Sequence, residues 1–248
     1  MNGLLNLAYP LLGGIDSYFL WLPDVVRVAL WGAVSGLLAM MLYVLMSNQG
    51  SIKAMQGEAR QLRGSVQQAD DAGEAARLAL ENLKLSFRVL GKVTLPAMLS
   101  GIPVIFVLAW LAATYDTVAP PAGAPVPVTA EPADVALQLT PPAAEPSAIA
   151  WPAPGGEYQV ADSTGTIFAA PATATPPTIV HKRVWWNVLL GNEAGYLPDS
   201  AAVDAIHLAV PSRELWSVGP SWMHGWLFVY LVSLIIVSLF VKFAFKIA

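Results

Sequence analysis

The chain has 248 residues, of which 56% are hydrophobic and 12% are charged, and it contains no cysteine. Soluble domains carry about 25% charged residues, so this composition is typical of an integral membrane protein. The lack of cysteine excludes disulfides, thiol catalysis, thiolate zinc sites and iron–sulfur clusters. The net charge of −4 divides unevenly, with −1 in residues 1–50, +2 in 51–115, −7 in 116–224 and +2 in the remainder.

Residues 1–24 are rich in aliphatic and aromatic side chains and contain no basic residue. They also lack a small-residue cleavage site, so they do not have the features of a secretory signal. Pro10, Gly13-Gly14 and Pro23 interrupt the segment into pieces too short to cross a bilayer. We predict an interfacial or re-entrant segment on the outer face.

The first predicted membrane helix covers residues 25–47, with an uncharged apolar run at 28–46. A run of this length is enough to span the hydrocarbon core. Asp24 and Arg27 stand at its start. Small residues recur along one face, where another helix could pack closely: Gly32, Ser35, Gly36 and Ala39.

Residues 51–92 are polar overall, but apolar side chains recur at alternating steps of three and four, which predicts an antiparallel coiled-coil hairpin. The seam of the first arm contains Ile52, Met55, Ala59, Leu62, Val66 and Ala69. The seam of the second arm contains Ala76, Leu80, Leu83, Phe87 and Leu90. Between the arms, Asp70-Asp71-Ala72-Gly73 interrupts the helix, and Asp71 with Glu74 resembles a capping box that restarts it.

The second predicted membrane helix covers residues 93–115, with an uncharged run at 93–113. Its length suits a hydrocarbon core of about 30 Å. Pro96, Gly101 and Pro103 interrupt this span. Each proline frees a backbone carbonyl that needs another partner, and Ser100 is a candidate local partner.

Residues 116–221 form a long insert. Between residues 120 and 177 it contains 13 prolines, five acidic residues and no basic residue, which disfavours long helices. Alternation at Val135, Leu137 and Leu139, together with residues 158–160 and 166–168 around Asp162-Ser-Thr-Gly165, predicts short strands and a hairpin turn. The insert is therefore either a small β element packed on another part or a mostly extended segment.

Further along the insert, residues 200–208 are predicted to form a short helix behind a Pro-Asp start. Trp185, Trp186 and Trp216 suit the membrane interface; substrate stacking is the alternative role. The third predicted membrane helix covers residues 222–242, behind Trp222 and Trp226, and a short tail follows at 243–248.

Basic residues predict the orientation of the chain. Seven Lys or Arg lie between the first two spans, and two more lie at the C-terminal end. By the positive-inside rule both regions face the cytoplasm. The N-terminus and the acidic insert would then lie outside.

The order of parts resembles the YidC/Oxa superfamily of membrane-protein insertases, in its minimal three-helix branch of archaeal YidC-like proteins and endoplasmic-reticulum insertase subunits. The residues that carry the likeness are 82–87, Pro96, Ile102-Pro103, Trp110 and Tyr115, then Gly225-Trp226, Tyr230, Ser233, Ser238 and Lys242. The likeness covers residues 25–116 and 220–246. It implies an integral protein of a prokaryotic inner membrane, with membrane-protein clients and with the ribosome as a partner of the hairpin.

Two features differ from that family. Its members carry a positive charge in a hydrophilic groove open to the cytoplasm, whereas the charge nearest a span interior here is Arg27, close to the outer end. The insert of about 100 residues replaces a short connection. These differences leave two function classes open: an insertase or chaperone, and a non-catalytic scaffold subunit of a larger membrane complex.

The chain shows no nucleophile–base pair, phosphate-binding glycine loop or paired intramembrane carboxylates, so we predict that it is not an enzyme. His181, His207 and His224 are scattered, and we expect no metal and no cofactor. The basic residues of the hairpin are balanced by acidic ones, so direct nucleic-acid recognition is not expected.

A groove that lowers the cost of moving polar segments into the bilayer would present hydroxyls and charge. Its candidate residues are Arg27, Ser35, Tyr43, Ser100, Tyr230, Ser233 and Ser238; each serine could equally form a helix–helix hydrogen bond. A flexible apolar client surface, or ordinary lipid-facing side chains, would come from Met40, Met41, Met46, Met55 and Met98. Arg27 itself either pairs with Asp24 or a headgroup, or points into the groove.

Overall fold

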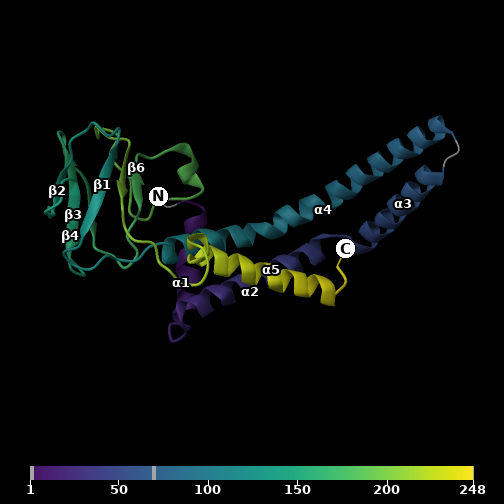
Figure 1. The fold of residues 1–248 in the computed structure, drawn as a ribbon, viewed down its shortest axis with the longest axis horizontal. Helices are drawn as coiled ribbons and strands as arrows, with labels where there is room; N and C mark the ends of the chain where they lie inside the picture. The colour runs from purple at the N-terminus through teal and green to yellow at the C-terminus, as the bar shows by residue number, and fades with distance from the viewer. Residues whose placement is uncertain (1–2, 69–70, 248) are drawn as a thin grey trace. The chain divides into compact units, whose positions relative to one another are not determined.

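The computed structural model describes residues 3–68 and 71–247, and Figure 1 shows the elements. The chain forms two compact units. One contains Met1–Val28 and Phe106–Phe228, and the other contains Ala29–Ile105 and Val229–Ala248. The helices at Asp24–Met46, Ala72–Tyr115 and Trp226–Ala244 contribute residues to both units.

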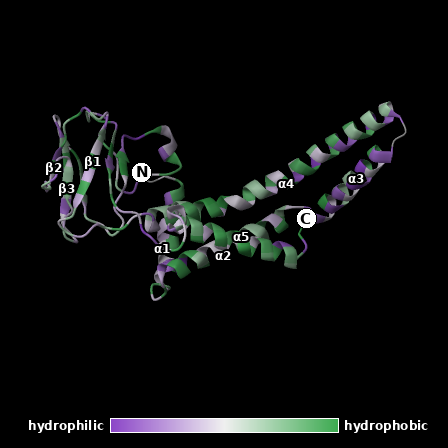
Figure 2. Cartoon of the chain, viewed as in Figure 1, coloured by the Kyte–Doolittle hydropathy of each residue, from purple (hydrophilic) through white to green (hydrophobic). Residues whose placement is uncertain are grey.

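Three helices are long and apolar enough to cross a membrane: α2 (Asp24–Met46), α4 (Ala72–Tyr115) and α5 (Trp226–Ala244). In Figure 2 most residues of α2 and α5 are hydrophobic, whereas the polar hairpin that follows α2 contains both hydrophilic and hydrophobic residues. The prediction of three apolar helices is therefore confirmed. Their length and composition suggest an integral membrane protein.

The prolines do not interrupt the second span. Pro96 and Pro103 lie inside α4, which is a single helix of 44 residues. Each proline costs one backbone hydrogen bond, a loss that membrane helices tolerate. The hydroxyl of Ser100 donates to the carbonyl of Ala97 at 2.9 Å, and this is not one of the carbonyls four residues before a proline. The predicted role of Ser100 is therefore wrong.

The predicted hairpin corresponds to α3 (Gln49–Gln68) and the first half of α4. On α3 the predicted seam is turned inward, because Ile52 and Ala59 are buried while Met55, Leu62 and Val66 are half-buried. At the start of α4, Asp71 accepts hydrogen bonds from the N–H groups of Gly73 and Glu74 at 3.1 and 3.4 Å, as expected of a capping residue. Ala69 and Asp70 lie outside the described residues.

On α4 the predicted seam is wrong. The predicted side chains are 52–64% exposed: Leu80, Leu83, Phe87 and Leu90. The less exposed face instead carries a second heptad pattern, of Ala75, Leu78, Asn82, Leu85 and Val89. Both stripes have helical spacing, and the predicted stripe carries the larger side chains.

A β-domain (residues 117–212) forms most of the first unit. Its strands are β1 (Pro125–Glu131), β2 (Gln138–Thr140), β3 (Ala148–Ala150), β4 (Glu157–Asp162), β5 (Gly165–Pro171), β6 (Ile179–His181) and β7 (Ala205–Leu208). They form a four-stranded sheet in the order β3-β1-β7-β6 and a three-stranded sheet in the order β2-β4-β5. Neighbouring strands are antiparallel.

Side-chain alternation explains how a proline-rich segment becomes a strand. In β1, Val126 and Val128 are buried while Pro125 and Pro127 are exposed. This first part of β1 pairs with β3, and residues 128–131 pair with β7. The prolines thus occupy a stretch with one strand neighbour, where a missing N–H is tolerated.

One hydrophobic core joins both sheets. It contains Trp151, Tyr158, Val160, Ile206 and further aliphatic side chains. The predicted hairpin around residues 162–165 is confirmed as β4 and β5, and the insert is a folded β element rather than an extended segment. The helix predicted at 200–208 is wrong: Ala205, Ile206 and Leu208 are buried in a strand that pairs with β1 and β6.

The N-terminal segment contains η1 (Leu5–Ala8) and α1 (Tyr9–Ser17). Pro10 stands in the first turn of α1, where a proline is favoured. Gly13 and Gly14 lie within the helix, so the predicted interruptions there are wrong. With nine residues, α1 is too short to span a bilayer. Two further turns are η2 (Trp185–Val188) and η3 (Ser221–Met223).

Candidate functional site

A buried polar cluster lies at the start of α2, within the unit that contains the β-domain. Arg27 is 8% exposed, and its guanidinium forms ion pairs with Asp16 of α1 and, at 3.0 Å, with Asp24. Arg213 contacts the other oxygen of Asp24 at 3.1 Å. The Tyr115 hydroxyl donates to Asp16 at 3.1 Å, and both guanidinium groups lie within 5.6 Å of its ring centre. Two cations thus face two anions in a charge-balanced cluster.

This geometry contains the Arg27–Asp24 pair that the sequence suggested. Asp16 and Arg213 were not anticipated. Asp16 is the only charged side chain before Asp24, and an isolated acid in an apolar stretch is the signal that could have identified it. All three guanidinium nitrogens of Arg27 have a carboxylate partner. Its alternative role as a charge directed into a groove remains a prediction.

Four of the candidate groove residues lie where α2 meets α5. Ser233 donates to the carbonyl of Ala29 at 2.6 Å, and the side chains of Ser35 and Tyr230 are buried, at 2% and 0% exposure. A Cβ on Gly36 would lie 2.9 Å from the Ser238 hydroxyl. These side chains therefore form helix–helix contacts within the second unit.

The small-residue stripe of α2 explains why the two helices approach so closely. A Cβ on Gly32 would lie 2.5 Å from the carbonyl oxygen of Tyr230, and one on Gly36 would lie 2.7 Å from that of Leu234. Real Cβ atoms do not come this near to backbone oxygens. The glycines are therefore required for backbone-to-backbone packing of the kind common between membrane helices.

The remaining candidates are dispersed over the helices. Tyr43 and Ser100 are buried, at 8% and 5% exposure. Among the methionines, Met41, Met46 and Met98 are 47–69% exposed, whereas Met40 and Met55 are half-buried. Exposure on membrane helices suits either lipid or a client, so the client surface also remains a prediction.

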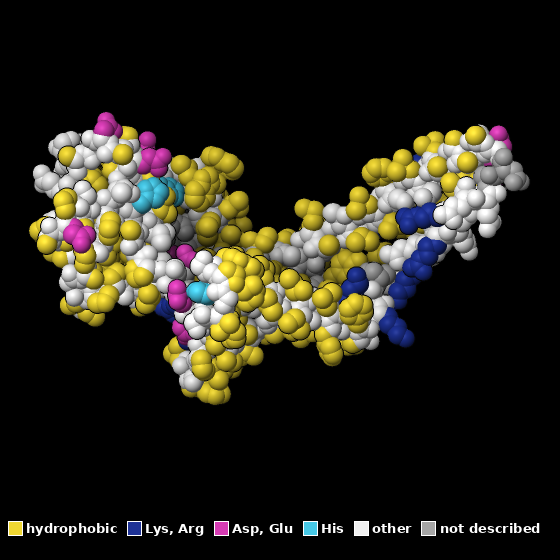
Figure 3. Space-filling model, in the orientation of Figure 1, with side chains coloured by type: hydrophobic (Ala, Val, Ile, Leu, Met, Phe, Trp, Pro, Cys, Tyr) yellow, Lys and Arg dark blue, Asp and Glu magenta, His cyan; other side chains and the backbone are white. Residues whose placement is uncertain are grey.

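A basic hollow was not anticipated from the sequence. It has a volume of about 470 Å³ and lies between α3 and the end of the chain. Four of its lining residues are cations: Lys53, Arg60, Lys242 and Lys246. The described residues around it include no Asp or Glu. Figure 3 shows Lys and Arg side chains gathered along this part of the second unit. The hollow offers positive charge for phosphate or carboxylate groups.

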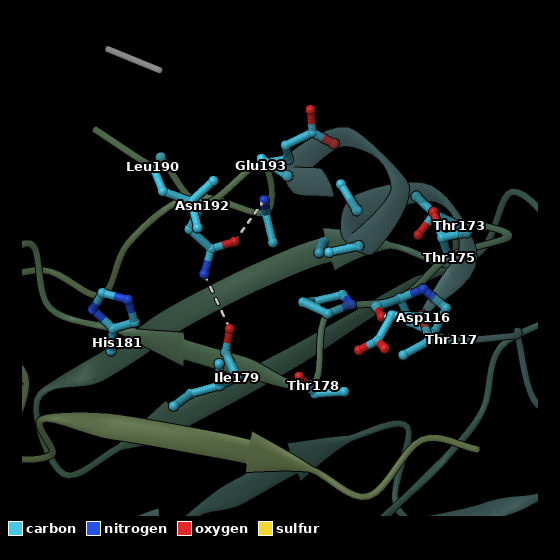
Figure 4. Close-up of a pocket in the computed structure, with 18 of the residues that line it drawn as sticks. Asp116, Thr117, Thr173, Thr175, Thr178, Ile179, His181, Leu190, Asn192 and Glu193 are labelled. Carbon is cyan, nitrogen blue, oxygen red and sulfur yellow. Dashed lines mark hydrogen bonds between the residues drawn. The ribbon is translucent and has the colours of Figure 1, made fainter. Parts of the chain in front are cut away.

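A second hollow, of about 600 Å³, opens on the β-domain beside β6 and the end of α4. Threonines and the polar side chains of Asp116, His181 and Asn192 line it (Figure 4). Asn192 donates to the Ile179 carbonyl at 3.0 Å and accepts from the Ala194 N–H at 3.1 Å, so its amide is fixed by the backbone. The hollow is open and is lined by both polar and apolar residues, and these described residues form no nucleophile–base pair.

Among residues 3–68 and 71–247, no group of three or more histidine or acidic side chains is placed to bind a metal ion. Comparison of the chain with protein-family models, curated proteins and solved structures gives no match. Functional inference therefore rests on the geometry of this chain and on the order of its parts.

Proposed function

We propose that the chain is a membrane-protein insertase or chaperone of the YidC/Oxa type, and not an enzyme. The order of its elements supports this proposal: one span, a polar helical hairpin, and two further spans. The observation that carries it is an exposed apolar stripe on α4. Such a stripe provides a path for an apolar segment of another protein to move along.

The α4 stripe consists of large side chains that are 47–69% exposed and recur at helical spacing through the second unit: Leu80, Leu83, Phe87, Leu90, Leu95, Met98, Ile102 and Ile105. Its second half lies in the span and its first half lies in the polar hairpin. Lipid can cover the second half. The first half is exposed in water unless another apolar surface covers it, and burying one such side chain fully stabilises by about 1.5–3 kcal/mol.

The basic hollow adds a second supporting feature. Lys53 and Arg60 lie on α3 at the base of the hairpin, and Lys242 and Lys246 lie at the end of α5. A client with acidic residues beside its apolar segment would meet positive charge there. The positive charge of the basic hollow would take the place of the groove charge that the family resemblance leads us to expect, at another position in the chain.

Client insertion tests the proposal. A photo-crosslinking residue at Leu83 should capture newly made membrane proteins, whereas the same residue at exposed Lys84 on the neighbouring face should not. Leu83→Asp should reduce insertion into proteoliposomes, and Lys84→Asp should not. Equal capture and equal insertion for the two positions would contradict the proposal.

The proposed orientation places the hairpin in the cytoplasm and the β-domain outside, in the inner membrane of a prokaryote. Single cysteines at Gln67 and Ala144 should therefore react with an impermeant thiol reagent from opposite sides, since the chain has no cysteine of its own. Labelling of both from the same side would overturn this topology.

A scaffold function is the second candidate, and the β-domain favours it. This domain has its own core and an open hollow, as expected of a module that contacts a fixed partner. Purification with one partner at constant stoichiometry, and without captured clients at Leu83, would select the scaffold function.

A further inference from the structure

Two segments far apart in the sequence are joined within the first unit. The N–H groups of Leu4 and Leu5 donate to the carbonyls of Val188 and Leu189, both at 2.8 Å. The Asn6 amide donates to the carbonyl of Gly191 at 3.2 Å and accepts from its N–H at 2.8 Å. A Cβ on Gly3 would lie 2.3 Å from the nitrogen of Gly191, so the two backbones touch at this glycine.

The joined segments expose a large apolar surface. The exposed side chains include Leu4, Leu7, Leu11 and Ile15 from one segment and Val184, Trp185, Trp186, Val188, Leu189 and Leu190 from the other. Trp185 is 84% exposed and Leu7 is 72% exposed. Residues 3–15 and 184–191 contain no charged residue. Figure 3 shows hydrophobic side chains gathered on this side of the β-domain.

Several backbone groups of the exposed loop are paired, either within the loop or with the N-terminal segment. Asn187 is 1% exposed, and its side chain accepts from the Val184 N–H at 2.8 Å and donates to the Leu190 carbonyl at 3.1 Å. The N–H groups of Leu189 and Leu190 donate to the Trp186 carbonyl. Irregular backbone in contact with hydrocarbon requires such pairing, because each unsatisfied group costs several kcal/mol. A loop exposed only to water has no such requirement.

Contacts with α4 place this surface beside a membrane span. The Tyr9 hydroxyl donates to the carbonyl of Ala109 at 2.8 Å, and the Tyr115 hydroxyl donates to Asp16. Both ends of α1 are thereby attached to the last two turns of α4 (Figure 1). Ala109 lies six residues before the end of α4, which is about 9 Å along the helix axis at 1.5 Å per residue. The surface thus lies beside the end of a helix that is long and apolar enough to cross a membrane.

We propose that residues 3–15 and 184–191 form a lipid wedge, which inserts its apolar side chains into the bilayer leaflet next to the β-domain. The occupant of this surface is lipid, because the wedge adjoins the end of a span and combines aliphatic side chains with exposed tryptophans, which favour the interface. Lys182 beside the surface is paired with Asp204 at 2.9 Å, whereas Arg183 is exposed at its edge, where headgroup phosphates would meet it. The wedge fixes the β-domain against the membrane, and its action does not depend on insertase activity.

Accessibility of single spin labels tests the wedge. The full chain is placed in lipid nanodiscs with one cysteine at Val188, Leu11 or Ser163, the last being an exposed turn residue of the β-domain. Labels at Val188 and Leu11 should collide more with oxygen, which concentrates in hydrocarbon, than with a water-soluble nickel complex. The label at Ser163 should show the opposite preference.

Gly3→Val serves as the matched variant, because its side chain cannot fit against Gly191. This variant should make the label at Val188 more accessible to the nickel complex and less accessible to oxygen. Limited proteolysis should show that the β-domain is still folded. The nanodisc contains no protein besides the purified chain and the scaffold protein that encircles the bilayer. If Val188 and Leu11 are then as accessible to the nickel complex as Ser163, a protein rather than lipid covers this surface in the cell and the proposal is wrong.

Discussion

The β-domain and the hairpin bury their large apolar side chains to different extents. The β-domain encloses Trp151, Tyr158 and Ile206 at 0–2% exposure within two small sheets. The hairpin leaves Leu83 and Phe87 at 52% and 64% exposure. The two sheets of the β-domain therefore enclose a core, whereas the described hairpin leaves large apolar side chains on its surface.

This difference in burial means that the same kind of residue, a large apolar side chain, has two roles in this chain. In the strands of the β-domain a buried apolar residue packs in the core, so its removal should lower the stability of the domain. On the α4 stripe an apolar residue with similar spacing is about half exposed among the described residues, so its removal should affect binding instead. Substitutions matched between the two regions measure this distinction.

The largest effect is expected in the β-domain core. Trp151 is 2% exposed and packs against Tyr158, with ring centres 5.1 Å apart. Trp151→Ala should destabilise the domain by about 3–5 kcal/mol, because it removes a large buried side chain and leaves a cavity. Thermal unfolding of the purified protein measures the loss, with Trp185→Ala as the exposed control. Similar melting temperatures for the two variants would contradict the core assignment.

The next effect concerns the two stripes of α4. Leu85 is 7% exposed and Leu83 is 52% exposed, although they are two residues apart. Leu85→Ala should destabilise the hairpin by about 2–5 kcal/mol and increase its cleavage by protease. Leu83→Ala should leave cleavage unchanged and reduce client crosslinking. If Leu83→Ala is the more protease-sensitive variant, the originally predicted seam is correct and the exposed stripe is not a binding surface.

The sequence could predict the number of apolar helices because an uncharged apolar run of about 20 residues matches the thickness of the hydrocarbon core when it forms a helix. It could also predict the β4–β5 hairpin, since Asp162 and Gly165 are turn residues between alternating strands. It could not select between two helical stripes on α4, because both have the same period. That choice depends on which face other residues cover, and this is a tertiary property.

The strand β7 shows a second limit. Pro198-Asp199 followed by Ala-rich sequence resembles a helix start, but Ile206 and Leu208 complete a core supplied by β1, β4 and β6. The charged cluster around Arg27 shows a third limit of prediction from the sequence. Arg213 and Asp24 are 189 residues apart in the sequence, and no local pattern relates them. Long-range pairing determines both features.

A smaller effect is expected where α2 meets α5. Gly32→Ala places a methyl group 2.5 Å from the Tyr230 carbonyl oxygen, and overpacking of this kind costs about 1–3 kcal/mol. Gly101→Ala is the matched change, because no atom lies within 4 Å of its Cβ position and alanine is the better helix former. Gly32→Ala should slow disulfide crosslinking between cysteines at Ala29 and Ser233, and Gly101→Ala should not. Equal crosslinking would mean that the helices are not in backbone contact.

The smallest effect is expected at the turn between β4 and β5. Hydrogen bonds from the Thr164 hydroxyl and from the Ala202 N–H hold the pKa of the Asp162 carboxyl below its usual value. A carboxyl whose folded pKa is lowered stabilises the fold at pH values above its unfolded pKa, about 3.9, and this stabilisation is lost as the pH falls through the folded pKa. Asp162→Ala should therefore lower the stability of the β-domain at neutral pH and reduce its loss of stability on acidification.

Asp162→Asn separates the two contributions, since it keeps one of the two oxygen acceptors, for the Thr164 donors or for the Ala202 N–H, but cannot ionise. It should be more stable than Asp162→Ala at neutral pH and equally insensitive to acid. Asp134→Ala, at an exposed position of the same domain, should change neither property. Unfolding by denaturant at several pH values below 6 provides the measurement. If Asp162→Asn retains the acid sensitivity of the unsubstituted chain, other carboxyl groups produce it and the turn is not held by the ionised side chain.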